Sequence, residues 1–299
     1  MPELPEVETI VRDLQKNIQG DVIVDFWSDW KKSLKNISFS KFKKEIQGIK
    51  ILEIKRIGKN IFLNLSNKKT IYIHLKMTGH LLIKTKKKKN KYFEEKVNQY
   101  IHHIWFLCSV NCQQKKRQRK IKKNDYDKTL AFSDLRKFAK IKLIDTSKIE
   151  NLSEIKNLGT DVNSKEFTLK NFLKLLERKP QSLIGNILMN QKVMAGIGNI
   201  YRSEILFDAK ISPFRKVKDL SAKEKKNIYK SIKKIIQKAI QKRGTSDSDY
   251  RDTQGRKGNF HNYLRVYHKE GEKCWRCPGR IVRDKIGQRS VFWCKECQK

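Results

Sequence analysis

The first hydrophobic pattern in the chain has the period of a helix. Apolar residues recur every three or four positions from Val7 to Ile18, and Gly20 follows the last of them. Acidic residues occupy the first turn, where a carboxylate faces the positive end of a helix. The pattern predicts one amphipathic helix over residues 4–19.

The pattern then changes to the alternation that is typical of strands. Four short apolar runs follow one another between residues 49 and 83, and turn-forming residues separate them. Three more strands are predicted over residues 101–107, 130–132 and 138–144. A lysine-rich segment between about residues 84 and 128 interrupts this series and predicts elongated loops around one strand. We therefore expect an antiparallel β-sandwich or barrel in the N-terminal half.

Helical spacing returns in the second half. The polar residues that lead up to Thr160 predict a linker between two domains. Helices are predicted over residues 167–176, 183–189, 200–207 and 222–243. The last forty residues differ, because they combine four cysteines with short strands expected around Tyr267, Ile281 and Val291. The second half is thus expected to be mainly helical, with a small appended module.

The charge balance points to a polyanionic partner. The chain has 69 Lys and Arg against 31 Asp and Glu, which gives a formal net charge of +38. Self-repulsion of this size is costly unless a polyanion neutralises it, so nucleic acid is the leading partner. An AT-rich genome also enriches lysine whatever the protein does, and we assign part of the excess to that cause.

Nothing in the sequence indicates a membrane or secreted protein. No apolar run reaches the roughly eighteen residues needed to span a bilayer. The amino terminus also lacks the basic and then apolar pattern of a secretory signal. We expect a cytoplasmic protein whose six cysteines are reduced thiols or metal ligands and not disulfides.

Four of the cysteines have the spacing of a structural zinc site. Cys274 and Cys277 form one pair, and Cys294 and Cys297 form a second pair after sixteen intervening residues. Two such pairs can offer four thiolates to a tetrahedral ion, which leaves no position for a catalytic water. Four unconnected buried thiols are the alternative. Cys108 and Cys112 are left over and are expected to have no metal.

The start of the chain carries a candidate nucleophile. A small second residue such as Pro2 usually permits removal of the initiator methionine, which would expose a secondary α-amine. The reference pKa of an α-amine is about 7.7 to 8.0, so a useful fraction is neutral near pH 7. Attack of this amine on a sugar's anomeric carbon would release the base and leave an iminium, which promotes loss of phosphate. Taken alone, however, a Met-Pro-Glu start usually reflects processing only.

Six separated segments, in order along nearly the whole chain, resemble formamidopyrimidine-DNA glycosylase. They are Pro2–Glu8, Arg56–Lys59, His74–Gly79, Asp134–Phe138, Gly196–Tyr201 and the terminal four-cysteine module. Each segment alone is a weak signal, but six in the right order make coincidence negligible. The resemblance implies a bifunctional DNA glycosylase and lyase of base excision repair that removes oxidised purines such as 8-oxoguanine and formamidopyrimidines and cleaves the strand by β,δ-elimination.

The resemblance also implies the fold and the partners. It predicts an α+β protein with an N-terminal antiparallel β-sandwich and flanking helix, then a helix-two-turn-helix domain with a β-hairpin zinc finger. The expected limits are 1–145 for the catalytic domain, 146–160 for a linker, 161–265 for the helical domain and 266–299 for the zinc finger. The implied partner is damaged double-stranded DNA, and a monomer with one structural zinc ion and no small-molecule cofactor is expected.

The family's site residues carry over to matching positions of this chain. The implied catalytic residues are Pro2, Glu3, Glu6, Lys59 and Arg289. The implied DNA-binding residues are His74, Met77, Arg136, Phe138, Asn199 and Tyr201. Among these, Met77, Arg136 and Phe138 would fill the gap left by the extruded base. Without the resemblance, Met77 and Phe138 would be assigned to the core, and Glu3 and Glu6 to simple helix-end charges.

Three further features compare this chain with the family, and the second and third of them depart from its usual pattern. The segment Arg243–Tyr250 resembles the loop that covers the flipped base, and it favours a purine-type enzyme. Gly185, however, stands where this branch usually has lysine, which is more similar to the endonuclease VIII-like branch that prefers oxidised pyrimidines. The basic expansion around residues 84–128, which includes the basic run Lys115–Lys120, exceeds the family's usual loop and would add non-specific DNA contact or nothing. Two other functions stay open: an inactive zinc-containing protein that binds DNA without chemistry, and a protein whose excess positive charge serves association with RNA.

Overall fold

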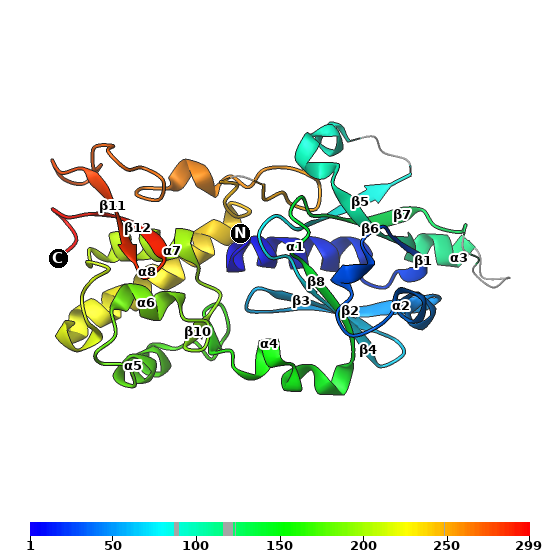
Figure 1. Ribbon diagram of the computed structural model, residues 1–299, viewed down its shortest axis with the longest axis horizontal. Coiled ribbons are helices and arrows are strands. Elements are labelled where there is room, and N and C mark those ends of the chain that lie inside the picture. Colours follow the sequence, from blue (N-terminus) through cyan, green and yellow to red (C-terminus); the bar gives the residue numbers. More distant parts are fainter. Residues whose placement is uncertain (87–89, 116–121, 123, 248) are drawn as a thin grey trace. The chain divides into compact units, whose positions relative to one another are not determined.

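The computed structural model describes residues 1–86, 90–115, 122, 124–247 and 249–299, and Figure 1 shows the chain. Contacts between Cα atoms divide it into two compact units. The first unit contains residues 1–2, 6–155 and 243–259, and the second contains residues 3–5, 156–242 and 260–299. Residues 243–259 thus belong to the first unit, although the sequence places them beyond the helical segments.

The first unit is built on one antiparallel sheet in the strand order β5-β7-β6-β1-β2-β3-β4-β8. The strands are β1 (Val22–Ser28), β2 (Ile49–Ile57), β3 (Asn60–Leu65), β4 (Lys69–His74), β5 (His80–Thr85), β6 (Ile101–Cys108), β7 (Lys128–Ser133) and β8 (Lys140–Asp145). β1 and β2 are joined by only two residue pairs. Apolar residues of both halves, such as Trp105 and Ile61, enter the same core, so the sheet forms a sandwich.

Helix α1 (Leu4–Ile18) places its apolar residues from Val7 onward in that core, as their helical spacing predicts. Helix α2 (Phe39–Ile46) adds Phe42 and Ile46 to the same core. Neither α2 nor β1 was predicted from the sequence. β1 is buried on both faces over most of its length, so it lacks the alternation that identifies a half-exposed strand.

The lysine-rich segment contains more regular structure than the elongated loops predicted for it. Around β6 lie the 3₁₀ helices η2 (Lys91–Glu94) and η3 (Lys96–Asn98) and the short helix α3 (Val110–Lys115). Most of the basic run, including Lys116, Arg117, Arg119 and Lys120, lies outside the described residues. Its suggested DNA contacts stay a prediction. A short connection follows β8 through η4 (Thr146–Asn151) and α4 (Ser153–Lys156).

The second unit is mainly helical, as predicted. Its helices are α5 (Leu169–Glu177), α6 (Ile184–Met189), α7 (Asn199–Ala209) and α8 (Ala222–Gln241), with 3₁₀ turns η5 (Val217–Asp219) and η6 (Phe260–Tyr263). A capping box between Ser221 and Glu224 begins α8. β9 (Thr160–Asp161) and β10 (Met194–Ala195) form a small parallel pair, and β11 (Ile281–Ile286) and β12 (Arg289–Cys294) form an antiparallel hairpin.

Gly185 has a packing explanation in this unit. A Cβ atom at that position would lie 2.7 Å from Cδ1 of Ile286 and 2.8 Å from the carbonyl oxygen of Pro213. A side chain fits there only if the end of the Ile286 side chain moves and the backbone near Pro213 shifts. Close packing alone therefore accounts for the glycine, which weakens it as a signal of lesion preference.

No helix among the described residues is both long and apolar enough to cross a membrane.

Candidate active site and nucleic-acid interface

Glu3 is fixed by the beginning of helix α7. Its buried carboxylate accepts hydrogen bonds from the backbone N–H groups of Gly198, at 2.6 Å, and Ile200, at 3.0 Å. These donors lie at the positive end of the helix, which stabilises a negative charge. A Cβ atom on Gly198 would lie 2.3 Å from the carboxyl carbon of Glu3, so the glycine is required for this approach. Pro2 precedes this anchored residue by one peptide bond.

Arg202 organises the groups around Glu3 within the second unit. Its side chain is only 1% exposed, and Nη2 donates to Oδ1 of Asn199 and to the carbonyl oxygen of Ser290, both at 2.7 Å. Burial lowers the pKa of Arg202 to about 10, Glu3 opposes this shift and Arg289 adds to it. Arg202 therefore stays charged at neutral pH. Because the amide oxygen of Asn199 accepts from Arg202, its amide nitrogen points away from Arg202 and can donate to another group.

Sequence reasoning missed Arg202. The sequence signal was limited, because only five of the eight residues in the predicted helical segment 200–207 are apolar; the structure buries Arg202 among them. A charged residue at such a position is rare unless it is paired. It links α7 to Ser290, which follows Arg289 at the start of β12.

Lys59 and His74 belong to one basic cluster in the first unit. Lys59 is largely buried and follows Gly58, whose φ of 60° forms the tight turn between β2 and β3. Nδ1 of His74 accepts a hydrogen bond from the backbone N–H of Lys76 at 3.0 Å. Burial, followed by the positive charges of Lys76, Lys59 and Lys140, lowers the pKa of His74 to about 4. The ring is neutral at pH 7, so its proton resides on Nε2, which can act as a donor.

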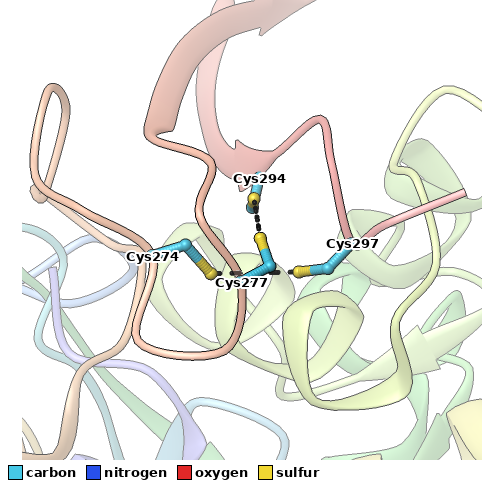
Figure 2. A group of neighbouring side chains, drawn as sticks. All are labelled: Cys274, Cys277, Cys294 and Cys297. Carbon is cyan, nitrogen blue, oxygen red and sulfur yellow. Dashed lines mark hydrogen bonds between the residues drawn. The ribbon is translucent and has the colours of Figure 1, made fainter.

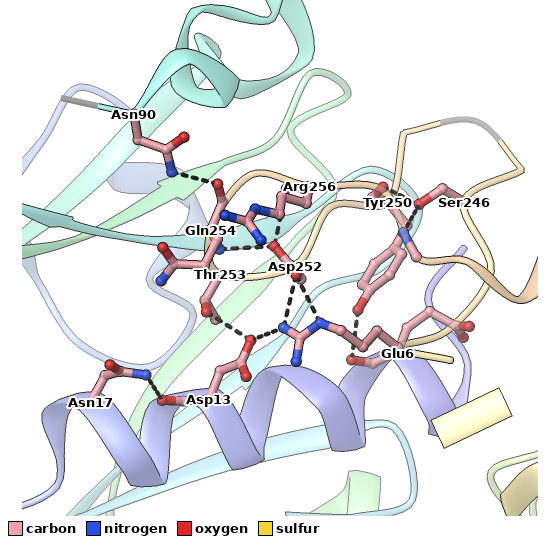
Figure 3. Close-up of polar contacts among 12 residues, drawn as sticks. Glu6, Asp13, Asn17, Asn90, Ser246, Tyr250, Asp252, Thr253, Gln254 and Arg256 are labelled. Atoms are coloured by element: carbon pink, nitrogen blue, oxygen red, sulfur yellow. Dashed lines mark hydrogen bonds and ion pairs between the residues drawn. The ribbon is translucent and has the colours of Figure 1, made fainter. Parts of the chain in front are cut away.

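Glu6 anchors the segment that follows α8. Its Oε1 accepts a hydrogen bond from the backbone N–H of Thr245 at 2.7 Å, and Gly244 approaches it so closely that a Cβ atom would lie 2.7 Å from the same oxygen. The hydroxyl of Tyr250 lies 3.5 Å from the carbonyl oxygen of Glu6, and burial raises the pKa of Tyr250 well above its usual value (Figure 3). Glu6 therefore anchors the chain that follows α8, in addition to placing a negative charge in the first turn of α1.

The same segment is tied to the middle of α1. Arg243 donates to Asp13 at 2.5 Å and to Asp252 at 2.8 Å, and the hydroxyl of Thr253 donates to Asp13 at 2.8 Å. These bonds join α1 to both ends of the Arg243–Thr253 stretch, in which Ser248 lies outside the described residues.

Met77 and Phe138 are not core residues. They are 40% and 52% exposed, and the guanidinium of Arg136 lies 4.7 Å from the centre of the Phe138 ring. Two buried groups hold their loops in place. The carboxylate of Asp134 accepts from the backbone N–H of Phe138 at 2.9 Å and from the Thr78 hydroxyl, and that hydroxyl accepts from the backbone N–H of Arg136 at 3.1 Å.

Tyr201 is buried, unlike Met77 and Phe138. Its side chain is 0% exposed and packs against Phe260 with the ring centres 5.7 Å apart. The resemblance implies a DNA-contacting residue here, but this side chain is part of the core of the second unit. We expect Tyr201 to support helix α7 through packing.

The four predicted cysteines come together at one end of the hairpin (Figure 2). Their sulfur atoms all lie within 4.8 Å of one another, with 3.9 Å between Cys274 and Cys297 and 3.5 Å between Cys277 and Cys294. A Zn–S bond of about 2.3 Å gives sulfur–sulfur distances of about 3.8 Å in a tetrahedron. The cluster can therefore hold a metal ion.

Taken together, these groups indicate a class of protein. Basic side chains, exposed loops that carry Met77 and Phe138, and a hairpin with four clustered cysteines are typical of a nucleic-acid-binding protein. Residues 1–141 match the family model of the formamidopyrimidine-DNA glycosylase N-terminal domain, and residues 158–250 match that of the formamidopyrimidine-DNA glycosylase H2TH domain.

Relatives cover the whole chain. It is 36% identical over 300 residues to the formamidopyrimidine-DNA glycosylase of Pelotomaculum thermopropionicum, with 100% of this chain and 99% of the relative aligned. The corresponding enzyme of Carboxydothermus hydrogenoformans is also 36% identical, with full coverage of both chains at 100%. The structure matches Lactococcus lactis Fpg in complex with DNA containing an abasic site, with a TM-score of 0.83, 30% identity and 100% coverage of both chains.

A further match is MutM in complex with DNA containing carbocyclic 8-oxo-G, with a TM-score of 0.80, 30% identity and 100% coverage of both chains. The chain belongs to the formamidopyrimidine-DNA glycosylase family. The resemblance inferred from the six segments is confirmed, and so is the α+β fold with an antiparallel N-terminal sheet and a helix-two-turn-helix domain. Family membership makes the chain a DNA glycosylase of base excision repair, and the family activity includes cleavage of abasic sites.

Proposed function

We propose that this chain excises oxidised purines from duplex DNA and cleaves the strand at the abasic site that results, with the nitrogen of Pro2 as nucleophile. The observation that carries the proposal is the anchoring of Glu3, next to Pro2, at the start of α7. A mutant of the related Lactococcus lactis Fpg has been solved with DNA containing Fapy-dG, and MutM with DNA containing carbocyclic 8-oxo-G. Both lesions are oxidised purines, which agrees with this choice of substrate.

The chemistry follows from a secondary amine. The Pro2 nitrogen forms a bond to C1′ of the sugar as the bond between C1′ and the base breaks, and the base leaves with that electron pair and takes up a proton. The attacking nitrogen then loses its proton, and the C1′–O4′ bond breaks as O4′ takes the electron pair and a proton. This ring opening leaves an iminium between Pro2 and C1′, which acidifies the C2′ hydrogen. Loss of that proton expels the 3′ phosphate, and a second elimination expels the 5′ phosphate. Glu3 is the group placed to transfer protons.

The phosphate contacts are assigned to groups on both units. Lys59 and neutral His74 would act from the first unit, and Asn199 and Arg289 from the second. Support comes from the donors that the structure gives them: a lysine at a tight turn, an imidazole with its proton on Nε2, and an amide whose oxygen is held by Arg202. Such contacts fix register on DNA and do not read its sequence.

Met77, Phe138 and Arg136 would occupy the gap in the duplex. Extrusion of a nucleotide costs a few kcal/mol, and stacking of apolar side chains recovers part of this cost. The exposure of the two apolar side chains supports the assignment, since solvent exposure is unfavourable for such groups without a partner. Arg136 would hydrogen-bond the base opposite the lesion.

The cysteine cluster would hold one structural zinc ion. A shell of four thiolates leaves no open position, so the ion would stabilise the hairpin and supply no catalytic water. Cys274, Cys277, Cys294 and Cys297 are its ligands in this proposal. The domain limits 1–145, 161–265 and 266–299, with a linker at 146–160, stay a prediction, and residues 243–259 group with the first compact unit.

A panel of duplexes, each with a single lesion, tests this function. Cleavage is expected with 8-oxoguanine, with formamidopyrimidine and with a preformed abasic site, and no cleavage is expected with undamaged DNA. Faster excision of an oxidised pyrimidine than of either purine lesion would contradict the assignment of substrate. A protein that shifts the abasic duplex on a gel but leaves it uncut would be a binding protein only.

Gly198→Ala is expected to slow excision by about a hundredfold. The backbone at Gly198 is extended, with φ near −130°, so alanine is allowed there, but its methyl group would displace the Glu3 carboxylate. The loss of two charge-assisted hydrogen bonds should cost the folded state about 1 to 3 kcal/mol. Single-turnover excision and urea unfolding measure the two effects. Glu3→Gln, which keeps the shape, provides the comparison, and a G198A rate within twofold of wild type would contradict the role of this contact.

A further inference from the structure

Part of the lysine-rich segment has a structural partner that the sequence did not indicate. Residues Asn90–Gln99 contain η2 and η3. They contact the stretch Arg251–Arg256 through hydrogen bonds, an ion pair and a cation–π contact. Both stretches belong to the first unit. They are separated by about 160 positions in sequence, so no local pattern predicts the contact.

Asn98 is the buried centre of this contact. Its Nδ2 donates to the carbonyl oxygen of Gly255 at 3.1 Å and to that of Tyr92 at 2.6 Å, while its Oδ1 lies 2.9 Å from Nε2 of His80. The side chain is 0% exposed, and its amide oxygen and nitrogen are both engaged. Gly255 has a φ of 79°, and a Cβ atom there would lie 2.9 Å from Nδ2 of Asn98. The backbone at residue 255 is therefore held by one amide group.

Three contacts surround Asn98. Nδ2 of Asn90 donates to the carbonyl oxygen of Gln254 at 2.9 Å, as Figure 3 shows. Glu95 accepts from the buried Arg251 at 3.0 Å, and the same guanidinium donates to the carbonyl oxygen of Tyr250 at 2.9 Å. Arg256 lies over the ring of Tyr92 at 5.1 Å.

The opposite side of the same stretch is bound to α1 and to the sheet. Thr253 bonds to Asp13 through its hydroxyl, and its carbonyl oxygen accepts from the backbone N–H of Ile83 at 2.9 Å. The stretch Arg251–Arg256 is thus held from two directions. Through Tyr250 it connects directly to Thr245 and Glu6, because the Tyr250 hydroxyl and the Thr245 N–H both reach Glu6.

We propose that Asn90–Gln99 is a positioning element for base excision, with Asn98 and Glu95 as its principal residues. It holds Arg251–Arg256, and thereby fixes Tyr250 and the chain near Thr245 against Glu6. This inference rests on the proposed function and on the expectation from the sequence resemblance that the Arg243–Tyr250 loop covers the extruded base. The element touches no substrate and acts through the loop, so these are positioning residues and not catalytic ones.

The proposal makes a selective prediction. A loop that covers the extruded base matters only when a base is present. Loosening the element should therefore slow the release of 8-oxoguanine, and it should leave cleavage of a preformed abasic site nearly unchanged. General damage to the fold would reduce both activities in the same proportion.

Asn98→Asp is the sharpest variant. It keeps the size of the side chain and an acceptor for His80, but it turns a carboxylate oxygen toward the carbonyl oxygens of Tyr92 and Gly255. Asn67→Asp is the matched control, because Nδ2 of Asn67 also donates to a backbone carbonyl, that of Glu45 at 2.8 Å, in the turn between β3 and β4. Glu95→Gln tests the ion pair at a less buried position.

The measurements are single-turnover excision of 8-oxoguanine, cleavage of an abasic duplex, and hydrogen exchange of residues 251–256. For N98D we expect excision to fall about ten- to a hundredfold with abasic cleavage within about twofold, and faster exchange in 251–256. E95Q should show the same selectivity with a smaller fall, and N67D should match wild type. E95Q also keeps the test valid if N98D does not fold.

Equal losses of the two activities in E95Q or in a folded N98D would overturn the proposal, and so would unchanged excision in both variants. Failure of the proposed function is distinguishable, because the wild-type protein itself would then release no 8-oxoguanine. If the wild-type protein releases 8-oxoguanine but the variants lose excision and abasic-site cleavage equally, only the positioning role of Asn90–Gln99 is refuted.

Discussion

A chain that keeps a residue in front of Pro2 is expected to lose both excision and abasic-site cleavage, each by at least about a thousandfold. When the Pro2 nitrogen is part of a peptide bond it has no available lone pair and cannot attack C1′. A free α-amine has a reference pKa of about 7.7 to 8.0, so it is partly neutral at working pH, unlike lysine. The nucleophile is therefore lost without any change in the fold.

The measurement combines single-turnover excision with borohydride trapping on a duplex that contains 8-oxoguanine. The wild-type protein should give a covalent adduct that peptide mapping places on Pro2, and the blocked protein should give none. Pro2→Gly keeps a free amine but makes it primary, so an intermediate loss is expected. Lys35→Ala, at an exposed lysine, is the control and should match wild type. Undiminished excision by the blocked protein would refute the mechanism.

Elements whose apolar residues alternate along a strand or recur at helical spacing were predictable from the sequence. Helix α1, the strands β2 to β5 and helices α5 to α8 all appear within a few residues of the predicted limits. The predicted strand over 138–144 begins two residues later, at Lys140, because Asp134 binds the backbone N–H groups of Phe138 and Ala139 and so holds them out of the strand. A contact four residues away thus overrides local propensity.

The residues of the candidate site were only partly predictable from the sequence. Residues near a recognisable segment, such as Glu3 and Lys59, could be assigned from the resemblance. Their surroundings could not be predicted, since they depend on contacts between distant parts of the chain. Glu3 binds Gly198, 195 positions away, and Arg202 reaches Ser290, 88 positions away. Asn98, in a segment judged by its charge alone, is a third example, because its role comes from Gly255 and not from its neighbours.

Removal of the zinc ion proposed for the cysteine cluster is the second large effect that we expect. The buried core around the hairpin contains six residues, Phe207, Val266, Cys274, Ile281, Phe292 and Cys294, and two of these are proposed metal ligands. A core of this size does not fold without a cross-link or a metal. Loss of the ion should therefore disorder β12 from Arg289 to Cys294, and the carbonyl oxygen of Ser290 would no longer accept from Arg202.

Because Arg289 and the Arg202-held Asn199 would both lose their placement, affinity for an abasic duplex should fall by about a hundredfold or more. Chelator treatment and Cys294→Ser are expected to give the same loss, while circular dichroism should show that the helices α7 and α8 persist. Cys108→Ser and Cys112→Ser are the matched controls, since both thiols lie outside the cluster, and they should keep full affinity. Full affinity in C294S protein shown by elemental analysis to lack zinc would mean that the hairpin is held by its own packing, and the structural role proposed for the metal would then be wrong.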